Sequence, residues 1–88
     1  NFSADPQSGT VPLEVDFENE SSGDYDTCTW DFGDSATSDQ CNDPQHTYTS
    51  PGDYTVSLTV SGIGGEDMRI REEYIQVASI VYLPLLKK

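Results

Sequence analysis

The sequence predicts an all-β fold, an antiparallel β-sandwich of about seven short strands in a single domain. Three observations support this prediction. Apolar and polar residues alternate along several short runs, most clearly over residues 54–60, as in strands with one buried face. Clusters of glycine, proline, asparagine and aspartate separate the runs and favour turns. No helical period of useful length appears along the chain.

Three strands are expected in the first half of the chain, over residues 2–4, 13–17 and 27–32. The first ends at the Asp-Pro pair that follows it, because proline cannot donate to a strand ladder. The second alternates apolar with acidic residues, which predicts one buried face and one solvated face. The third carries the only tryptophan, Trp30, on the same face as Phe32.

Two polar segments follow these strands. Residues 19–26 are expected to form a loop, and residues 36–43 a short edge strand or loop. Two further strands, over residues 45–48 and 54–60, are joined by a Ser-Pro-Gly turn. A glycine-rich hairpin loop, residues 62–67, then leads to the last strand.

The last strand is expected over residues 68–77, and its pattern changes partway along. Its apolar residues fall on two opposite faces: Met68 and Ile70 on one, Ile75 and Val77 on the other. A β-bulge near Glu72 and Glu73 would reconcile the two faces, because an extra residue shifts the alternation.

The 88 residues include sixteen acids and four bases, for a formal net charge of −12. This length allows one domain, expected over residues 1–78, followed by a tail over residues 79–88. So acidic a body repels phosphate backbones, which argues against nucleic acid as a partner. The chain lacks a run of about 18 apolar residues, so no transmembrane segment is expected.

Cys28 and Cys41 are thirteen positions apart, on either side of Trp30. A structural zinc site needs about four ligands, and only His46 could join the two thiols. A catalytic Cys-His pair would need an oriented base and a pocket, and the sequence shows neither. We therefore expect a Cys28–Cys41 disulfide, which stabilises by roughly 3 kcal/mol in the chain-entropy model and implies an oxidising compartment outside the cell.

Three motifs stand in order along the chain: Trp30-Asp31-Phe32-Gly33-Asp34, His46-Thr47-Tyr48 and Pro51-Gly52-Asp53-Tyr54-Thr55-Val56. Together they resemble the polycystic kidney disease (PKD) domain, whose Trp-Asp-Phe-Gly-Asp-Gly signature here has Ser35 in its last position. The resemblance covers residues 2–77 and implies an immunoglobulin-like β-sandwich in which these motif residues are structural. It is a weak guide to function, because one fold hosts many roles.

Candidate catalytic residues are few. His46 is the only histidine, and the resemblance implies that it packs in the structure and does not serve a triad. Asp31 and Asp34 could suggest the carboxylate pair of a glycosidase, but that chemistry needs a cleft that a thin sandwich does not offer. We expect both to accept backbone N–H bonds in the turn, and the chain to be non-catalytic.

Asp24 and Asp26 lie two positions apart in the loop before the Trp30 strand. Calcium takes about six to eight oxygen ligands from carboxylates, carbonyls and water. Some PKD-like domains, notably in bacterial collagenases, bind calcium with acids of this loop and residues near the N-terminus, where Asn1 or Ser3 would contribute here. We expect the protein to require no cofactor, and calcium bound at Asp24 and Asp26 is the one candidate ligand.

Two Asn-x-Ser sequons, at Asn1 and Asn19, are candidate glycosylation sites. They would carry glycan only in a secreted protein whose host has the machinery. Such short motifs also arise by chance.

The tail contains the most hydrophobic stretch of the chain and ends in Lys87 and Lys88. Pro84 makes it a poor central strand. It is either a linker or cap on its own domain, or a strand that docks on another molecule. Its candidate interaction residues are Ile80, Val81, Tyr82, Leu83, Leu85 and Leu86.

Two functions follow. In the first, the chain is a non-catalytic structural or interaction module of a secreted or cell-surface protein, as the PKD resemblance implies. Its partners would be other protein domains, met through the sheet faces and exposed aromatics such as Tyr25 and Tyr82, and glycan contact is left open. In the second, the chain is a complete small secreted subunit whose tail docks on an edge strand of the next copy, giving a head-to-tail extracellular filament.

Overall fold

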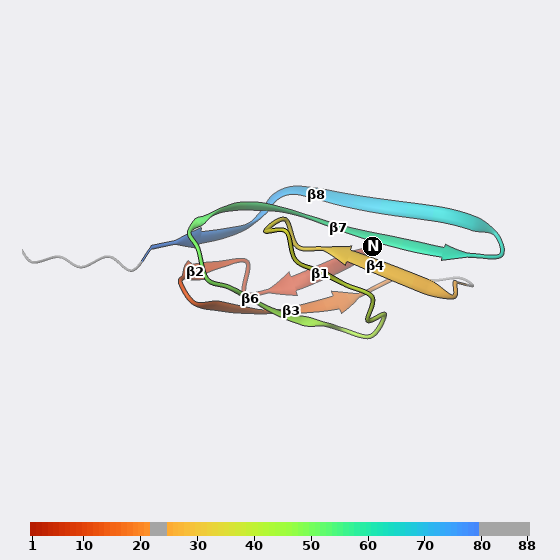
Figure 1. The fold of residues 1–88 in the computed structure, drawn as a ribbon, viewed down its shortest axis with the longest axis horizontal. Coiled ribbons are helices and arrows are strands. Elements are labelled where there is room, and N and C mark those ends of the chain that lie inside the picture. Colours follow the sequence, from red (N-terminus) through yellow and green to blue (C-terminus); the bar gives the residue numbers. More distant parts are fainter. Residues whose placement is uncertain (22–24, 80–88) are drawn as a thin grey trace, which may run out of the picture.

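A computed structural model describes residues 1–21 and 25–79 of the protein. Within these residues eight strands form two sheets that pack face to face (Figure 1). The smaller sheet has the order β1 (Phe2–Asp5), β3 (Leu13–Asn19), β6 (Gln45–Tyr48). The larger sheet has the order β2 (Ser8–Thr10), β8 (Gly65–Ala78), β7 (Gly52–Gly62), β4 (Thr27–Asp31), β5 (Thr37–Ser38). None of the described residues forms a helix that could cross a membrane.

The predicted β-sandwich is confirmed, and every expected strand is present. Of the two alternatives for residues 36–43, the structure has the edge strand, β5, which pairs with β4. The additional strand is β2, whose three residues pair in parallel with the end of β8. The sequence did not reveal β2 because Ser-Gly-Thr has neither alternation nor apolar residues.

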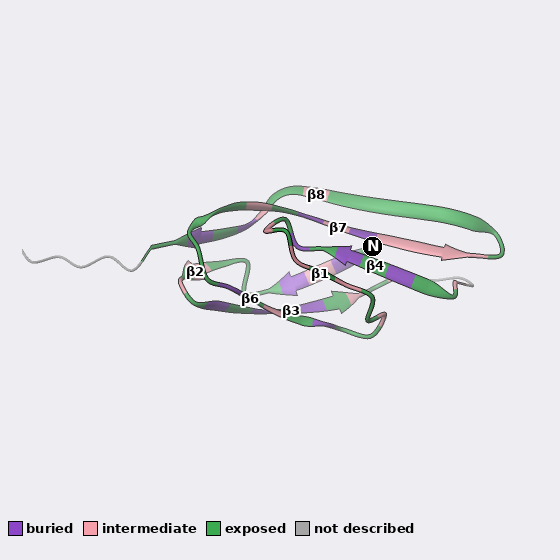
Figure 2. Ribbon diagram, viewed as in Figure 1, coloured by how far each residue is buried: buried purple, intermediate pink, exposed green. Residues whose placement is uncertain are grey.

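The core lies between the sheets and is built from alternate residues of the facing strands. β3 shows the principle: its three apolar residues are buried and the acids between them are exposed. Figure 2 shows buried segments along β1, β3 and β4. The buried apolar residues are Phe2, Ala4, Leu13, Val15, Phe17, Cys28, Trp30, Phe32, Tyr48, Val56, Leu58, Ile75 and Val77. Trp30, expected to be buried, is 0% exposed.

β7 and β8 form a long hairpin that closes tightly at Ile63-Gly64. The two strands are paired up to Gly62 and Gly65, so the turn is shorter than the loop expected over residues 62–67. Gly65 adopts φ +115°, a conformation that side chains oppose, which explains a glycine at this end of the turn.

The bulge predicted near Glu72 and Glu73 is present. Tyr54 pairs with Ile75 and Val56 pairs with Arg71, so three residues of β8 lie opposite one residue of β7, and Glu73 has φ +50°. This bulge contains two extra residues, and two residues leave the alternation of faces unchanged.

The expected consequence of the bulge is therefore wrong. Arg69 and Arg71 lie on the same side of the sheet as Ile75, because they pair with the buried Leu58 and Val56. Met68 and Ile70 instead face outward and are 57% and 53% exposed. Figure 2 shows that β8 is exposed along most of the stretch between the turn and the bulge.

Candidate functional site

The turn after β4 is held by two aspartates. The Asp31 carboxylate accepts a hydrogen bond from the backbone N–H of Gly33 at 3.0 Å, and the Asp34 carboxylate accepts one from Ala36 at 3.2 Å. Gly33 has φ +88°, and a Cβ at this position would collide with the backbone carbonyl of Thr55. The predicted role of Asp31 and Asp34 in organising the turn is confirmed.

His46 connects β6 to this turn. Its Nε2 lies 2.7 Å from the second carboxylate oxygen of Asp34. Its ring stacks on Phe32, with ring centres 4.3 Å apart and planes within 6°, and meets Tyr48 edge-on. The histidine thus packs in the structure as expected, with one ring face covered by an aromatic neighbour.

Tyr48 is the most deeply placed polar group of this region. Its hydroxyl donates a hydrogen bond to the backbone carbonyl of Phe32 at 2.8 Å. Burial raises the pKa of Tyr48 well above its ordinary value of about 10, and the nearby negative charge of Asp34 raises it further. The ring of Tyr54 packs against that of Tyr48, and its hydroxyl donates a hydrogen bond to the backbone carbonyl of Ser50.

The predicted Cys28–Cys41 disulfide is present, with an S–S distance of 2.12 Å and Cα atoms 5.2 Å apart. It lies beside the core, since Cys28 is 2% exposed. The Asn19 amide donates a hydrogen bond to the carbonyl of Cys41 at 2.9 Å, and the Trp30 indole donates one to the carbonyl of Gln40. These bonds attach the segment after β5 to the end of the sandwich.

The calcium prediction depends on Asp24, which lies outside the described residues. The other expected contributors are engaged elsewhere: the Asn1 amide oxygen accepts a hydrogen bond from Arg71 at 2.7 Å, and the Ser3 hydroxyl donates one to Glu20. Among the described residues no three histidine, cysteine or acidic side chains are grouped closely enough to hold a metal. Calcium at Asp24 and Asp26 stays a prediction.

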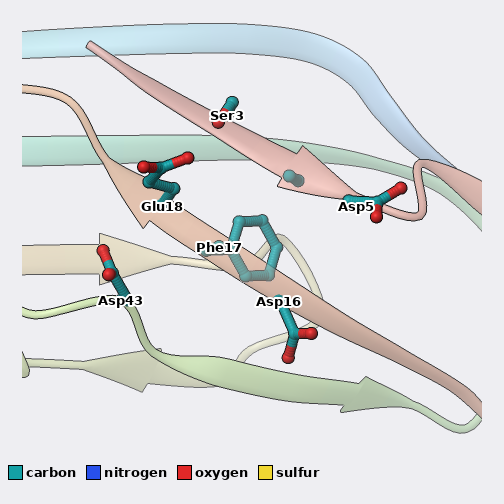
Figure 3. Close-up of a pocket in the computed structure, with 7 residues that line it drawn as sticks. Ser3, Asp5, Asp16, Phe17, Glu18 and Asp43 are labelled. Atoms are coloured by element: carbon teal, nitrogen blue, oxygen red, sulfur yellow. The ribbon is translucent and has the colours of Figure 1, made fainter.

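An acidic hollow lies on the outer face of the smaller sheet (Figure 3). It measures about 290 Å³, and Asp5, Asp16, Glu18 and Asp43 carry its negative charge. Asp5 and Asp16 are direct cross-strand partners, a like-charge pairing that is unfavourable unless the carboxylates stay solvated. The alternating acids of β3 were visible in the sequence, whereas the approach of Asp43 from the loop before β6 was not.

The two sequon asparagines differ in which amide atom is hydrogen-bonded. Asn1 is exposed, with its amide oxygen bound by Arg71. The Asn19 nitrogen that would carry a glycan donates to the carbonyl of Cys41, inside a half-buried site. A glycan at Asn19 would have to replace this hydrogen bond.

The tail residues expected to mediate interaction, Ile80 to Leu86, lie outside the described residues, as does Tyr82 among them. Tyr25, expected to be exposed, is half-buried and packs against the core. Among residues 1–21 and 25–79, the exposed large apolar side chains lie on the β7–β8 hairpin: Ile63 at its tip and Met68 and Ile70 on its outer face. Sequence reasoning missed this surface because it placed Met68 and Ile70 inside.

Comparison with known proteins gives a family match over most of the chain. A family model described as "PKD domain" matches residues 3–77. The "Collagenase ColA" of Bacillus cereus is 37% identical over 68 residues, which is 73% of this chain and 7% of the relative. The "Microbial collagenase" of Vibrio alginolyticus is 41% identical over 61 residues, 65% of this chain and again 7% of the relative. The chain therefore spans a small fraction of the curated relatives it matches.

Solved structures give the same picture for the fold. The PKD1 domain of the Vibrio cholerae metalloprotease PrtV has a TM-score of 0.68 and 31% identity, over 88% of this chain and 91% of that one. The PKD1 domain of Vibrio anguillarum Epp has a TM-score of 0.67 and 32% identity, over 89% and 92%. A structure described as "Structural basis for the promiscuous specificity of the carbohydrate-binding modules from the beta-sandwich super family" has a TM-score of 0.75 and 25% identity, over 90% of this chain and 33% of that one.

Proposed function

The chain belongs to the PKD domain family, and we propose that it is a non-catalytic accessory module of a larger extracellular protein. In this role it would connect or orient other domains and offer its sheet faces to protein partners. The collagenase relatives make a secreted enzyme that acts on a macromolecule the favoured kind of parent.

One observation carries this proposal: the chain matches nearly the whole of two solved domains and only 7% of each collagenase. A unit that is complete as a fold and small relative to its relatives behaves as a domain inserted among others. The role of such a module depends on what its surfaces bind, because the catalytic residues of a parent enzyme lie in other domains of that enzyme.

The geometry of the motif residues supports a non-catalytic role. The carboxylates of Asp31 and Asp34 accept hydrogen bonds from backbone N–H groups of the turn. His46 is held by its contacts with Asp34 and Phe32. General acid–base catalysis needs such groups to reach a substrate proton from an accessible site. These contacts are the ones that fix the fold.

The disulfide supports an extracellular location. The Cys28–Cys41 disulfide is stable in an oxidising compartment, whereas cysteines of cytosolic proteins are normally kept reduced. The acidic body, with a net charge of −12, favours a solvated surface over contact with nucleic acid.

A protein partner is favoured over a sugar. Every aromatic residue that the structure describes is buried or half-buried, so the described faces offer little ring surface on which a sugar could stack. The solvent-exposed polar and apolar side chains lie instead on strands of the two sheets, such as β3 and β8.

The proposal is tested on the isolated 88-residue chain. It should unfold in one cooperative transition and should cleave neither casein nor gelatin above the rate in buffer. Turnover that His46→Ala abolishes in a chain that stays folded would contradict the non-catalytic assignment. Thr29→Ala, an exposed change on β4, is the matched control for handling and folding.

A further inference from the structure

The strand β8 has a long open edge. β7 lies along one side of it, but β2 covers the other side only at Gln76, Val77 and Ala78. From Gly65 to the bulge, no described strand pairs with this side, and residues 65–70 are all exposed. Half of the backbone N–H and C=O groups of this stretch therefore point away from β7 without a strand partner among the described residues.

The edge is also apolar on its outer face. Met68 and Ile70 are more than half exposed, and Ile63 at the adjoining turn is 95% exposed. An exposed edge of this length with apolar side chains is a site for pairing with another strand.

We infer that residues 65–71 of β8 pair antiparallel with the same residues of a second copy, about a two-fold axis at Met68. The regular part of the strand extends from the turn at Ile63-Gly64 to the bulge that begins after Arg71. Met68 is the central residue of that stretch. Two copies paired about it fit between the turn of one and the bulge of the other.

The charges select this register. A two-fold axis normal to the sheet keeps each face on its own side, so only residues of equal parity can lie opposite each other. With Met68 opposite its counterpart, Asp67 of each copy lies opposite Arg69 of the other. Opposite charges in direct cross-strand positions are favourable.

The neighbouring registers bring like charges together. An axis at Asp67 places that residue opposite itself. An axis at Arg69 places Arg69 opposite itself, although it also places Asp67 opposite Arg71 twice. An axis at Ile70 places Arg69 opposite Arg71 twice. Like charges directly opposite each other are destabilising, so the inward-facing charges reject these pairings and leave the Met68 register.

The remaining side chains are compatible with this pairing. Arg71 lies opposite Gly65 of the second copy, so its contacts with Asn1 and with the rings of Phe2 and Tyr74 are undisturbed. The larger sheets of the two copies then form one continuous sheet. Because only two short edges meet, the contact belongs to the weak, transient class that buries less than about 1,200 Å².

The test is sedimentation of the full chain over a concentration series at about 0.15 M salt, where long-range repulsion between acidic bodies is screened. Wild-type protein should show a reversible monomer–dimer equilibrium. Asp67→Arg alone and Arg69→Asp alone should each weaken it by about tenfold or more, because two attractive contacts become repulsive. The two single variants mixed together should form a heterodimer, and the double variant should dimerise as the wild type does.

A second measurement determines the register. Met68→Cys should give a disulfide-linked dimer under mild oxidation, because two cysteines at the axis lie within bonding distance. Ile70→Cys, which would lie opposite Glu66, should not. Monomeric wild-type protein at millimolar concentration, or an association constant that Asp67→Arg leaves unchanged, would overturn the inference; the latter result would indicate that association runs wholly through another segment such as the tail.

Discussion

Trp30 contacts both sheets and the segment that follows β5. Its ring is fully buried and contacts Phe2 and Phe17 of the opposite sheet, with ring centres 5.3 and 5.5 Å away. Its indole N–H donates to the carbonyl of Gln40, beyond the edge strand β5. One residue thus joins both sheets to the disulfide-bearing segment.

We predict that Trp30→Ala lowers the free energy of unfolding by roughly 3–5 kcal/mol, because it leaves a large cavity and an unpaired carbonyl. Thr29→Ala, its exposed neighbour on β4, loses only a cross-strand contact with Thr59 and should stay within about 1 kcal/mol of wild type. Urea denaturation of both variants checks this. A Trp30→Ala chain with wild-type stability would show that the core does not depend on this ring.

The raised pKa of Tyr48 makes the free energy of unfolding depend on pH. Burial raises its pKa in the folded chain, so the unfolded chain loses the hydroxyl proton first. The stabilisation is therefore complete below about pH 10 and is lost as the pH rises further toward the folded-state pKa. Urea denaturation between neutral and strongly alkaline pH should show the free energy of unfolding falling only at the alkaline end.

Tyr48→Phe is the control for this prediction. It should be less stable at neutral pH by about 1–3 kcal/mol, because the carbonyl of Phe32 loses its donor. Its stability should fall less steeply above pH 10. Parallel alkaline slopes in the two proteins would contradict the assignment to Tyr48.

At the scale of elements, strands with one regular period could be predicted from sequence. β3 and β4 have alternation that is unbroken, and both were placed with the correct buried residues. The turn after β4 was also predicted, because glycine and aspartate have local reasons to be there.

β8 could be predicted only in part. The bulge was foreseen from the break in pattern, but the number of extra residues determines which side faces inward, and the sequence does not state that number. An even number put Arg69 and Arg71 on the core side and left Met68 and Ile70 outside. The acidic hollow was equally hidden, since it needs Asp43 to approach β3 across the sheet.

The loop before β4 contains Asp24 and Asp26, the two residues predicted to bind calcium. If Asp24 and Asp26 bind calcium only in the folded state, millimolar calcium should raise the melting temperature relative to chelator, by linkage. At about 100 times the dissociation constant the gain is about 2.7 kcal/mol. The Asp24→Asn, Asp26→Asn double variant should lose the shift; an equal shift in both proteins would rule out this site.

At the scale of the whole molecule, the tail after Ser79 is expected to be an interaction segment or a linker. Docking of its apolar residues on a neighbour would contribute about 1.5–3 kcal/mol for each large side chain buried, before the cost of ordering the tail. Lys87 and Lys88 would approach an acidic body, so salt should weaken the contact.

We predict that ending the chain at Ser79 removes this association. Light scattering in the Asp67→Arg background, where pairing through β8 is blocked, isolates the contribution of the tail. Equal monomeric masses for the full and shortened chains at high concentration, with no filaments by electron microscopy, would assign the tail to a linker or cap.

The proposed function requires the chain to be one module of a larger extracellular protein. The size of the native polypeptide tests this most directly: an antibody raised against the folded domain, applied to cell and culture-medium fractions of the source organism, with the band identified by mass spectrometry. We expect a polypeptide several times larger than 9.7 kDa in the medium. A native band of about that size, or one confined to the reducing interior of the cell, would contradict the proposed function.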